Sequence, residues 1–173
     1  MPYFTKKVLR VDYQSFKSEA VTSFEIHPYY LKQYNNRWFL IGNRVEFMNL
    51  TNLALDRIVS FTEVDKIYEM TVIDFNEHFD DVIGVSIPQD GTATKITLHA
   101  AIDLAPYIIT KPIHGSQKNI TNDETGFTFS IAVIPNYELE KLILSFGEGL
   151  KVMAPDSFKA IIKQRLQTSL ANY

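Results

Sequence analysis

The fold is decided by the stretch His27-Pro28-Tyr29-Tyr30-Leu31-Lys32-Gln33-Tyr34-Asn35-Asn36-Arg37-Trp38-Phe39-Leu40. Its pair Asn35-Asn36 predicts a hairpin turn, because asparagine tolerates a positive φ. Residues 21–34 are therefore expected to form one strand, bent at Pro28. Residues 37–41 are expected to form the returning strand, which Gly42-Asn43 would end. The stretch mixes basic and aromatic residues and holds the only tryptophan of the chain.

Two neighbouring segments extend this hairpin into a larger sheet. Residues 6–14 alternate between apolar and polar side chains, which indicates a half-buried strand. Residues 52–62 show a similar pattern and predict one further strand. Four or five short antiparallel strands within about 60 residues are typical of a small barrel or a strongly bent sheet.

The second half of the chain has a different pattern. Residues 71–92 read as a connector in which Asp74 caps a short helix that runs to Phe79. Strands are expected at residues 95–99, 114–121, 127–134 and 150–153, and helices at 103–110, 137–146 and from Pro155 onwards. This order is β-α-β-β-α-β with a terminal helix, which is ferredoxin-like. We therefore expect an antiparallel β-barrel at 1–72, a connector at 73–92 and an α+β domain at 93–173.

Composition limits the classes of protein that fit. The 173 residues are 46% hydrophobic, enough to bury a core, so disorder is not expected. A net charge of -3 gives no bulk attraction to nucleic acid, so any such contact needs a local basic patch. The absence of cysteine excludes disulfides and cysteine-based zinc sites. We see no signal peptide and no apolar run near the roughly 20 residues of a membrane span, so a cytoplasmic protein is expected.

Several motifs resemble those of one known family. Trp38-Phe39-Leu40 is similar to the Trp-Tyr-Leu signature of the WYL-domain proteins, which are mostly bacterial transcriptional regulators. Further similarities lie at Tyr13-Gln14-Ser15, at His27-Pro28 with Lys32, and at Leu55-Asp56-Arg57-Ile58. Residues 93–173 resemble the C-terminal extension that often follows such domains, with matches at His114-Gly115-Ser116-Gln117, Ser145-Phe146-Gly147 and Val152-Met153-Ala154-Pro155.

This resemblance implies an Sm-like small β-barrel that senses a ligand for an attached DNA-binding domain. It also implies binding of single-stranded nucleic acid or a nucleotide-like molecule, and a C-terminal extension that helps to form a homodimer. Phe39 departs from the signature, because it lacks the phenol hydroxyl of tyrosine. No helix-turn-helix pattern precedes the first strand, so we expect either a part of a longer regulator or a sensor that works with a partner.

The candidate ligand site combines fixed positive charge with aromatic faces. Arginine offers a planar fork for phosphate, and aromatic rings can stack on bases. Alternation along the returning strand places Arg37, Phe39 and Ile41 on one face and Trp38 and Leu40 on the other. We expect Trp38 and Leu40 in the core, and Arg37 and Phe39 on the ligand side. With the resemblance, the predicted ligand-binding residues are Tyr13, Ser15, His27, Lys32, Arg37, Phe39 and Arg57.

Five of these candidates also have a simpler explanation. Arg57 could form a surface ion pair with Asp56, which would contribute little stability. Lys32 and Arg37 could belong to a solvated hairpin rim, and Phe39 could be buried against the second domain. His27 could be a hydrogen-bonding group within its strand rather than a ligand contact.

Other kinds of chemistry find little support in the sequence. The acidic cluster at residues 74–81 is better explained by helix capping than by a metal site. Phosphate-binding loops and hydrolase or metalloprotease motifs are missing, so we expect neither an enzyme nor a cofactor. The leading hypothesis is a ligand-sensing module of a transcriptional regulator. The alternative is a dimerisation or protein-interaction module that binds no small ligand.

Overall fold

The computed structural model describes residues 6–16, 18–47 and 50–173. The chain divides into two compact units, one up to Asn76 and one from Glu77. Residues 77–92, which the sequence assigned to a connector, therefore belong to the second unit. Phe79, Val82 and Ile83 are buried there.

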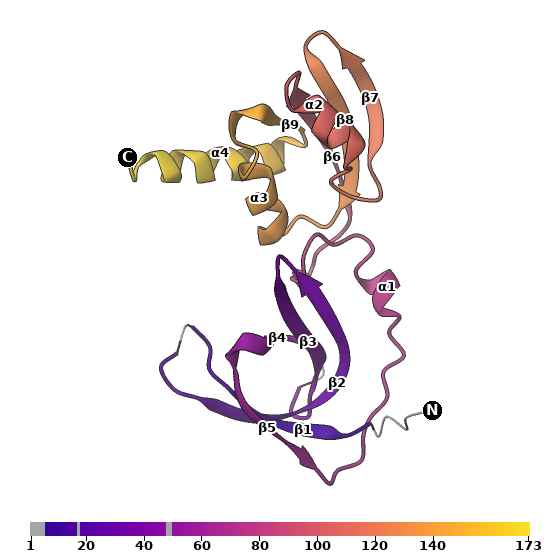
Figure 1. The fold of residues 1–173 in the computed structure, drawn as a ribbon, viewed down its shortest axis with the longest axis vertical. Helices are drawn as coiled ribbons and strands as arrows, with labels where there is room; N and C mark the ends of the chain where they lie inside the picture. Colours follow the sequence, from indigo (N-terminus) through magenta and orange to yellow (C-terminus); the bar gives the residue numbers. More distant parts are fainter. Residues whose placement is uncertain (1–5, 17, 48–49) are drawn as a thin grey trace. The chain divides into compact units, whose positions relative to one another are not determined.

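The first unit is a five-stranded antiparallel sheet (Figure 1). Its strands are β1 (Val8–Tyr13), β2 (Thr22–Tyr34), β3 (Arg37–Arg44), β4 (Leu50–Ala54) and β5 (Ile58–Val64). Their order in the sheet is β4-β3-β2-β1-β5, and every pair of neighbours is antiparallel. The 3-10 helix η1 (Leu55–Arg57) joins β4 to β5.

The predicted hairpin is confirmed. Asn35 and Asn36 have φ values of 48° and 61°, as the tight turn between β2 and β3 requires. The register of β2 shifts between Pro28 and Tyr30, which is the predicted bend. Gly42 does not end the second strand, and β3 continues through it to Arg44.

Two sequence predictions about this sheet are wrong. The strand expected at 52–62 is interrupted, because η1 turns the chain between β4 and β5. The expected barrel is also not closed: β4 and β5 lie at opposite edges and share no ladder within the described residues. Figure 1 shows a strongly curved open sheet instead. Periodicity could not reveal either point, because both depend on how the chain turns at η1.

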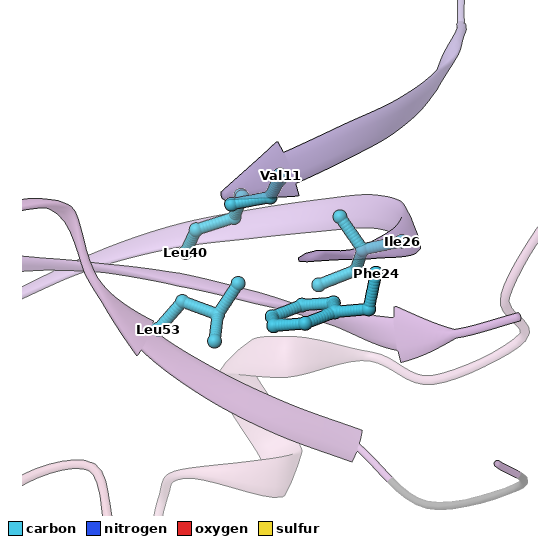
Figure 2. Packing of buried hydrophobic residues seen from close by; sticks show 5 residues of the cluster. All are labelled: Val11, Phe24, Ile26, Leu40 and Leu53. Atoms are coloured by element: carbon cyan, nitrogen blue, oxygen red, sulfur yellow. The ribbon is translucent and has the colours of Figure 1, made fainter. Parts of the chain in front are cut away.

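The core of the first unit forms on the concave side of adjoining strands. Figure 2 shows how its five buried side chains converge: Val11, Phe24, Ile26, Leu40 and Leu53. Leu9, Tyr13 and Ile58 pack against this cluster. The members come from four different strands and from both halves of the hairpin, so burying them holds the curved sheet together.

The prediction that Trp38 belongs to the core is wrong. Trp38 is 47% exposed, whereas Leu40, two residues along, is buried as expected. Trp38 lies opposite Gln33 near the turn, while the core gathers around Phe24 and Ile26 at the other end of β2. Ile41, which by alternation shares a face with Arg37 and Phe39, is fully buried in the middle of β3.

The second unit is an α+β structure with its own four-stranded sheet. Its strands are β6 (Thr94–Ala101), β7 (Lys118–Asp123), β8 (Gly126–Val133) and β9 (Leu150–Ala154), in the order β7-β8-β6-β9 with antiparallel neighbours. Its helices are α2 (Ala105–Thr110), α3 (Tyr137–Leu144) and α4 (Asp156–Leu170), with a 3-10 turn η2 (Gly147–Gly149). The short helix α1 (Phe75–His78) spans the division between the units.

Local signals placed these helices correctly. The Asp74 carboxylate accepts a hydrogen bond from the Asn76 amide at the start of α1. The Asn136 side chain accepts one from the Leu139 amide and so caps α3. The same side chain donates to the carbonyl oxygens of Ile83 and Ser86, which ties the segment before β6 to α3. Among the described helices, none is long and apolar enough to cross a membrane.

Candidate functional site

A cavity of about 640 Å³ opens where the β1–β2 loop meets η1 in the first unit. The loop contributes polar side chains and one aromatic ring, and η1 contributes two charged residues. The lining residues are Gln14, Ser15, Phe16, Ser18, Glu19, Asp56, Arg57, Ile58 and Val59. Two of the predicted ligand-binding residues, Ser15 and Arg57, therefore share one cavity.

Arg57 is the central cation of this cavity. Its guanidinium carbon lies 4.0 Å from the centroid of the Phe16 ring, in a cation–π arrangement. The carbonyl of Arg57 accepts a hydrogen bond from the Gln14 amide at 3.0 Å, so the backbone of η1 is tied to the loop. Its Nε is buried and has no hydrogen-bond partner among the described residues. Arg57 thus has an unused donor on a planar cation that is already stacked on a ring.

Asp56 pairs with Arg37 and not with Arg57. Arg37 Nη2 lies 3.2 Å from Asp56 Oδ2, and each side chain is less than half exposed. The pairing follows from the β3–β4 register, in which Phe39 lies opposite Ala54. Continuing this register by two residues along each chain segment brings Arg37 opposite Asp56. An ion pair with Asp56 was the simpler explanation of Arg57. Arg37 forms that ion pair instead.

Tyr13 lies next to the cavity but belongs to the core. It is half-buried at the end of β1, packs against the core cluster, and its ring centroid is 6.4 Å from that of Phe24. The register of β1 with β5 shifts at this point, so that Tyr13 lies opposite Ile58. Tyr13 supports the wall of the cavity rather than lining it.

Lys32 and Phe39 form a cross-strand pair away from the cavity. They lie opposite each other on β2 and β3, and both are half-buried. Burial lowers the pKa of the Lys32 amine from its ordinary value, because the charged form loses hydration. Neither residue is among those that line the cavity.

His27 is buried in a cluster of aromatic rings. Its Nδ1 accepts a hydrogen bond from the Glu69 amide at 3.1 Å, and its ring lies against those of Tyr29 and Tyr68. The Tyr68 hydroxyl in turn donates to the Pro28 carbonyl at 2.6 Å. The alternative in which His27 is a hydrogen-bonding group of its strand fits these contacts.

The structure thus brings together Ser15 and Arg57, with Arg37 joined to them through Asp56. Tyr13, His27, Lys32 and Phe39 do not line the cavity. Sequence reasoning missed Phe16, because residues 14–19 are mostly polar and show no hydrophobic periodicity. One signal was present: Phe16 is a large aromatic residue in an otherwise polar loop, directly after a strand.

The side chains that line the cavity are suited to binding an anionic ligand. It offers a guanidinium, an aromatic ring and serine side chains, which together fit an anionic group attached to a planar ring. Glu19 and Asp56 also line it, so the charge is mixed. Among the described residues no group of three or more histidine and acidic side chains could hold a metal ion.

Comparison with known proteins gives two family matches. Residues 3–63 match the model of the WYL domain, and residues 92–170 match the model of the WCX domain. The matched segments lie within the first and the second structural unit, respectively. No curated protein sequence matches the chain.

Two solved structures resemble the chain at low sequence identity. A CRISPR Cas-related protein is 10% identical, with a TM-score of 0.55, over 97% of this chain and 48% of that one. Proteasome accessory factor B/C (PafBC) of Arthrobacter aurescens is 17% identical, with a TM-score of 0.40, over 94% of this chain and 24% of that one. The chain therefore spans about half and about a quarter of the lengths of these proteins.

Proposed function

Because the chain belongs to the WYL-domain proteins and carries a WCX domain after its WYL domain, we propose that it is the ligand-sensing module of a bacterial transcriptional regulator. The observation that carries this proposal is the position of Arg57 in the cavity. A buried Nε without a partner is costly, since a polar group removed from water needs a hydrogen bond. A ligand that accepts hydrogen bonds from this guanidinium would compensate for the cost.

The ligand we propose is a single-stranded nucleic acid or a nucleotide-like molecule that bears phosphate. Arg57 would bind a phosphate oxygen through a charge-assisted hydrogen bond. Phe16, which is exposed and lies under the guanidinium, would offer its ring to a base. The Ser15 and Ser18 side chains at the same cavity are suited to sugar or phosphate oxygens.

The mixed charge of the cavity limits how many phosphates it can hold. Glu19 contributes a negative charge, and the charge of Asp56 is offset by Arg37. The positive charges of Arg37 and Arg57 are cancelled by the negative charges of Glu19 and Asp56. The site therefore has no net positive charge to attract a polyphosphate. A ligand with one phosphate at Arg57 fits this balance better than a nucleoside triphosphate.

Sensing would depend on the β1–β2 loop and η1, which together form the cavity. The ligand would join the β1–β2 loop to η1 and so favour one arrangement of that edge of the sheet. A DNA-binding domain attached to this module would then respond through the coupling between the two sites. In this proposal the module itself makes no contact with duplex DNA.

The finer description of the two folds is also our proposal. The second unit has the element order β-α-β-β-α-β and an antiparallel sheet in the order β7-β8-β6-β9, which supports a ferredoxin-like fold. For the first unit we propose an Sm-like arrangement in the form of a bent, open sheet. The strand order β4-β3-β2-β1-β5 supports this proposal.

Fluorescence anisotropy with short labelled oligonucleotides tests the proposed function. We expect single-stranded DNA or RNA to bind in preference to duplex, and the affinity to fall as salt rises because phosphate contacts release counterions. Arg57→Gln should weaken binding about 10- to 100-fold, the loss expected for one charge-assisted hydrogen bond. The control is Lys95→Gln on β6, which removes one positive charge outside the cavity. Equal losses in the two variants, or no binding at all, would count against the cavity.

A second candidate function rests on α4. Leu166 and Leu170, in the C-terminal half of this helix, are 54% and 74% exposed. Exposed apolar residues four positions apart share one helix face, as in a contact between proteins. A dimerisation module without a ligand would give a tight dimer that Leu166→Glu disrupts, and no response to any oligonucleotide. A monomer in sedimentation experiments would contradict this candidate.

A further inference from the structure

Arg44, at the end of β3, repeats the arrangement that Arg57 has in the cavity. Its guanidinium carbon lies 3.9 Å from the centroid of the Phe24 ring and 5.0 Å from that of the Phe47 ring. Its Nε, like that of Arg57, is buried and has no hydrogen-bond partner within the part of the chain that the structure describes. Arg44 is therefore a second planar cation that is held by aromatic rings and has an unused donor.

The chain turns after β3 in a way that brings Phe47 back to Arg44. The Phe47 amide donates a hydrogen bond to the Arg44 carbonyl at 3.1 Å, and the Val45 amide donates to the Glu25 carbonyl at 2.9 Å. The turn is thus closed on itself and attached to β2. The Phe47 ring is 57% exposed and the Arg44 side chain is 24% exposed, so both can be reached by a ligand. Phe16 beside Arg57 is exposed in the same way.

Arg44 lies on the same face of the sheet as the cavity. It is opposite Ile26, and Ile26 and Phe24 belong to the core cluster on the concave side (Figure 2). Residues directly opposite each other in an antiparallel pair point to the same face. The Tyr13 ring lies 6.4 Å from that of Phe24, and Tyr13 is opposite Ile58, which lines the cavity. Phe24 and Tyr13 therefore form a continuous aromatic connection between Arg44 and the cavity.

The charge around Arg44 leaves it available to an anion. Glu46 is the carboxylate paired with it, but 3.7 Å separate Arg44 Nη2 from Glu46 Oε2 and the Glu46 side chain is 65% exposed. Such a long and solvated ion pair contributes little, so a phosphate can replace it. The neighbouring carboxylate of Glu25 is already paired with Arg10 and Lys66. Its negative charge is therefore compensated by residues other than Arg44.

We propose that Arg44 and Phe47 form a second nucleotide subsite, and that the ligand is a nucleic-acid strand that occupies both arginine–phenylalanine pairs. One nucleotide would place its phosphate at Arg57 and its base on Phe16. Another nucleotide of the same strand would place its phosphate at Arg44 and its base on Phe47. A mononucleotide fills one pair only, so the second subsite selects a strand over a mononucleotide. This inference rests on the proposed function, because it extends the same ligand beyond the cavity.

Anisotropy titrations of the full chain with labelled thymidylates, from the mononucleotide to longer strands, test the second subsite. We expect the affinity to rise with length until both subsites are filled. Arg44→Gln should reduce the advantage of the strand over the mononucleotide about tenfold, the loss expected for one charge-assisted phosphate contact. It should also lower the slope of log affinity against log salt by about 0.7, the value for one phosphate of a single strand.

The matched control is Arg10→Gln on β1. Arg10 carries the same charge, is paired with Glu25 at 3.0 Å, and by alternation with Val11 lies on the other face of the sheet. This variant should leave the affinity for the strand within about twofold of the wild type. A second variant changes an exposed residue and so avoids any loss of folding. Glu46→Gln removes the competing carboxylate and should strengthen binding of the strand about threefold.

The outcomes separate this inference from the proposed function. Circular dichroism shows whether each variant is folded. A strand that binds no tighter than the mononucleotide, equal losses in Arg44→Gln and Arg10→Gln, or an unchanged affinity in Glu46→Gln would overturn the second subsite. If Arg57→Gln still weakens binding in that case, the cavity remains the ligand site and the proposed function stands. A wild-type chain that binds no thymidylate of any length would contradict both.

Discussion

Arg37 and Asp56 form an ion pair between β3 and η1, with 3.2 Å between Arg37 Nη2 and Asp56 Oδ2. The pair connects the turn end of the hairpin to the short helix that carries Arg57. It also occupies the carboxylate that would otherwise be available to Arg57. The guanidinium of Arg57 instead lies over Phe16. Arg57, the cation of the cavity, is therefore not paired with Asp56, the acidic residue that precedes it in the sequence.

This pair should affect ligand binding more than stability. Both side chains are more than a third exposed, so a double-mutant cycle in urea should give a coupling of about 1 kcal/mol or less, falling with salt. Arg37→Gln should weaken the binding of an anionic ligand, because Asp56 becomes uncompensated beside the cavity. Asp56→Asn should strengthen it. Anisotropy titrations measure whether each variant weakens or strengthens ligand binding. A change of affinity in the same direction for both variants would contradict this account.

Gly42 should be intolerant of any side chain. A Cβ at this position would lie 2.3 Å from the His27 carbonyl oxygen, a backbone atom of the paired strand β2. Gly42→Ala should therefore destabilise the chain by about 1–3 kcal/mol or more, as overpacking does. Gly115→Ala is the control, since a Cβ added there would meet no other group within 4 Å, and it should change stability by about 0.5 kcal/mol or less. Urea unfolding of both variants measures the difference, and similar midpoints would refute the close approach.

Glu25 should make stability depend on pH in the acid range. Hydrogen bonds from Lys66 and then Arg10 lower the pKa of its carboxyl from the ordinary value of 4.5. A group whose pKa is lower in the folded state contributes stability above pH 4.5 and loses it as pH falls through the folded pKa. Lys66→Met should raise the pKa of Glu25 in an NMR titration, whereas Lys95→Met should not. An unchanged titration in Lys66→Met would show that this contact does not form.

Much of the fold follows from local chemistry. The pair Asn35-Asn36 determines the hairpin, because two consecutive residues with positive φ are required there. Asp74 and Asn136 mark helix starts through their own hydrogen bonds. These features act within a few residues, so the sequence alone predicts them.

The candidate site was less predictable, because it depends on contacts between distant segments. The alternation over residues 52–62 could not show that the chain turns at η1, and that turn is what brings Arg57 to the loop after β1. Alternation also placed Trp38 in the core, whereas its exposure depends on where the curved sheet ends. Arg57 and Ser15 were identified only through the family resemblance. Phe16 was missed, because an aromatic ring in a loop has no periodic signal.

The most direct test of the central claim is the NMR signal of the Arg57 side-chain Nε–H group, assigned by its loss in Arg57→Lys. This Nε is buried without a hydrogen-bond partner among the described residues. On titration with a short single-stranded oligonucleotide, this signal should shift as a phosphate binds the Arg57 guanidinium, together with the amide signals of the cavity loop. Saturable binding that leaves the Arg57 signal unchanged would contradict the proposal that this cavity is the ligand site.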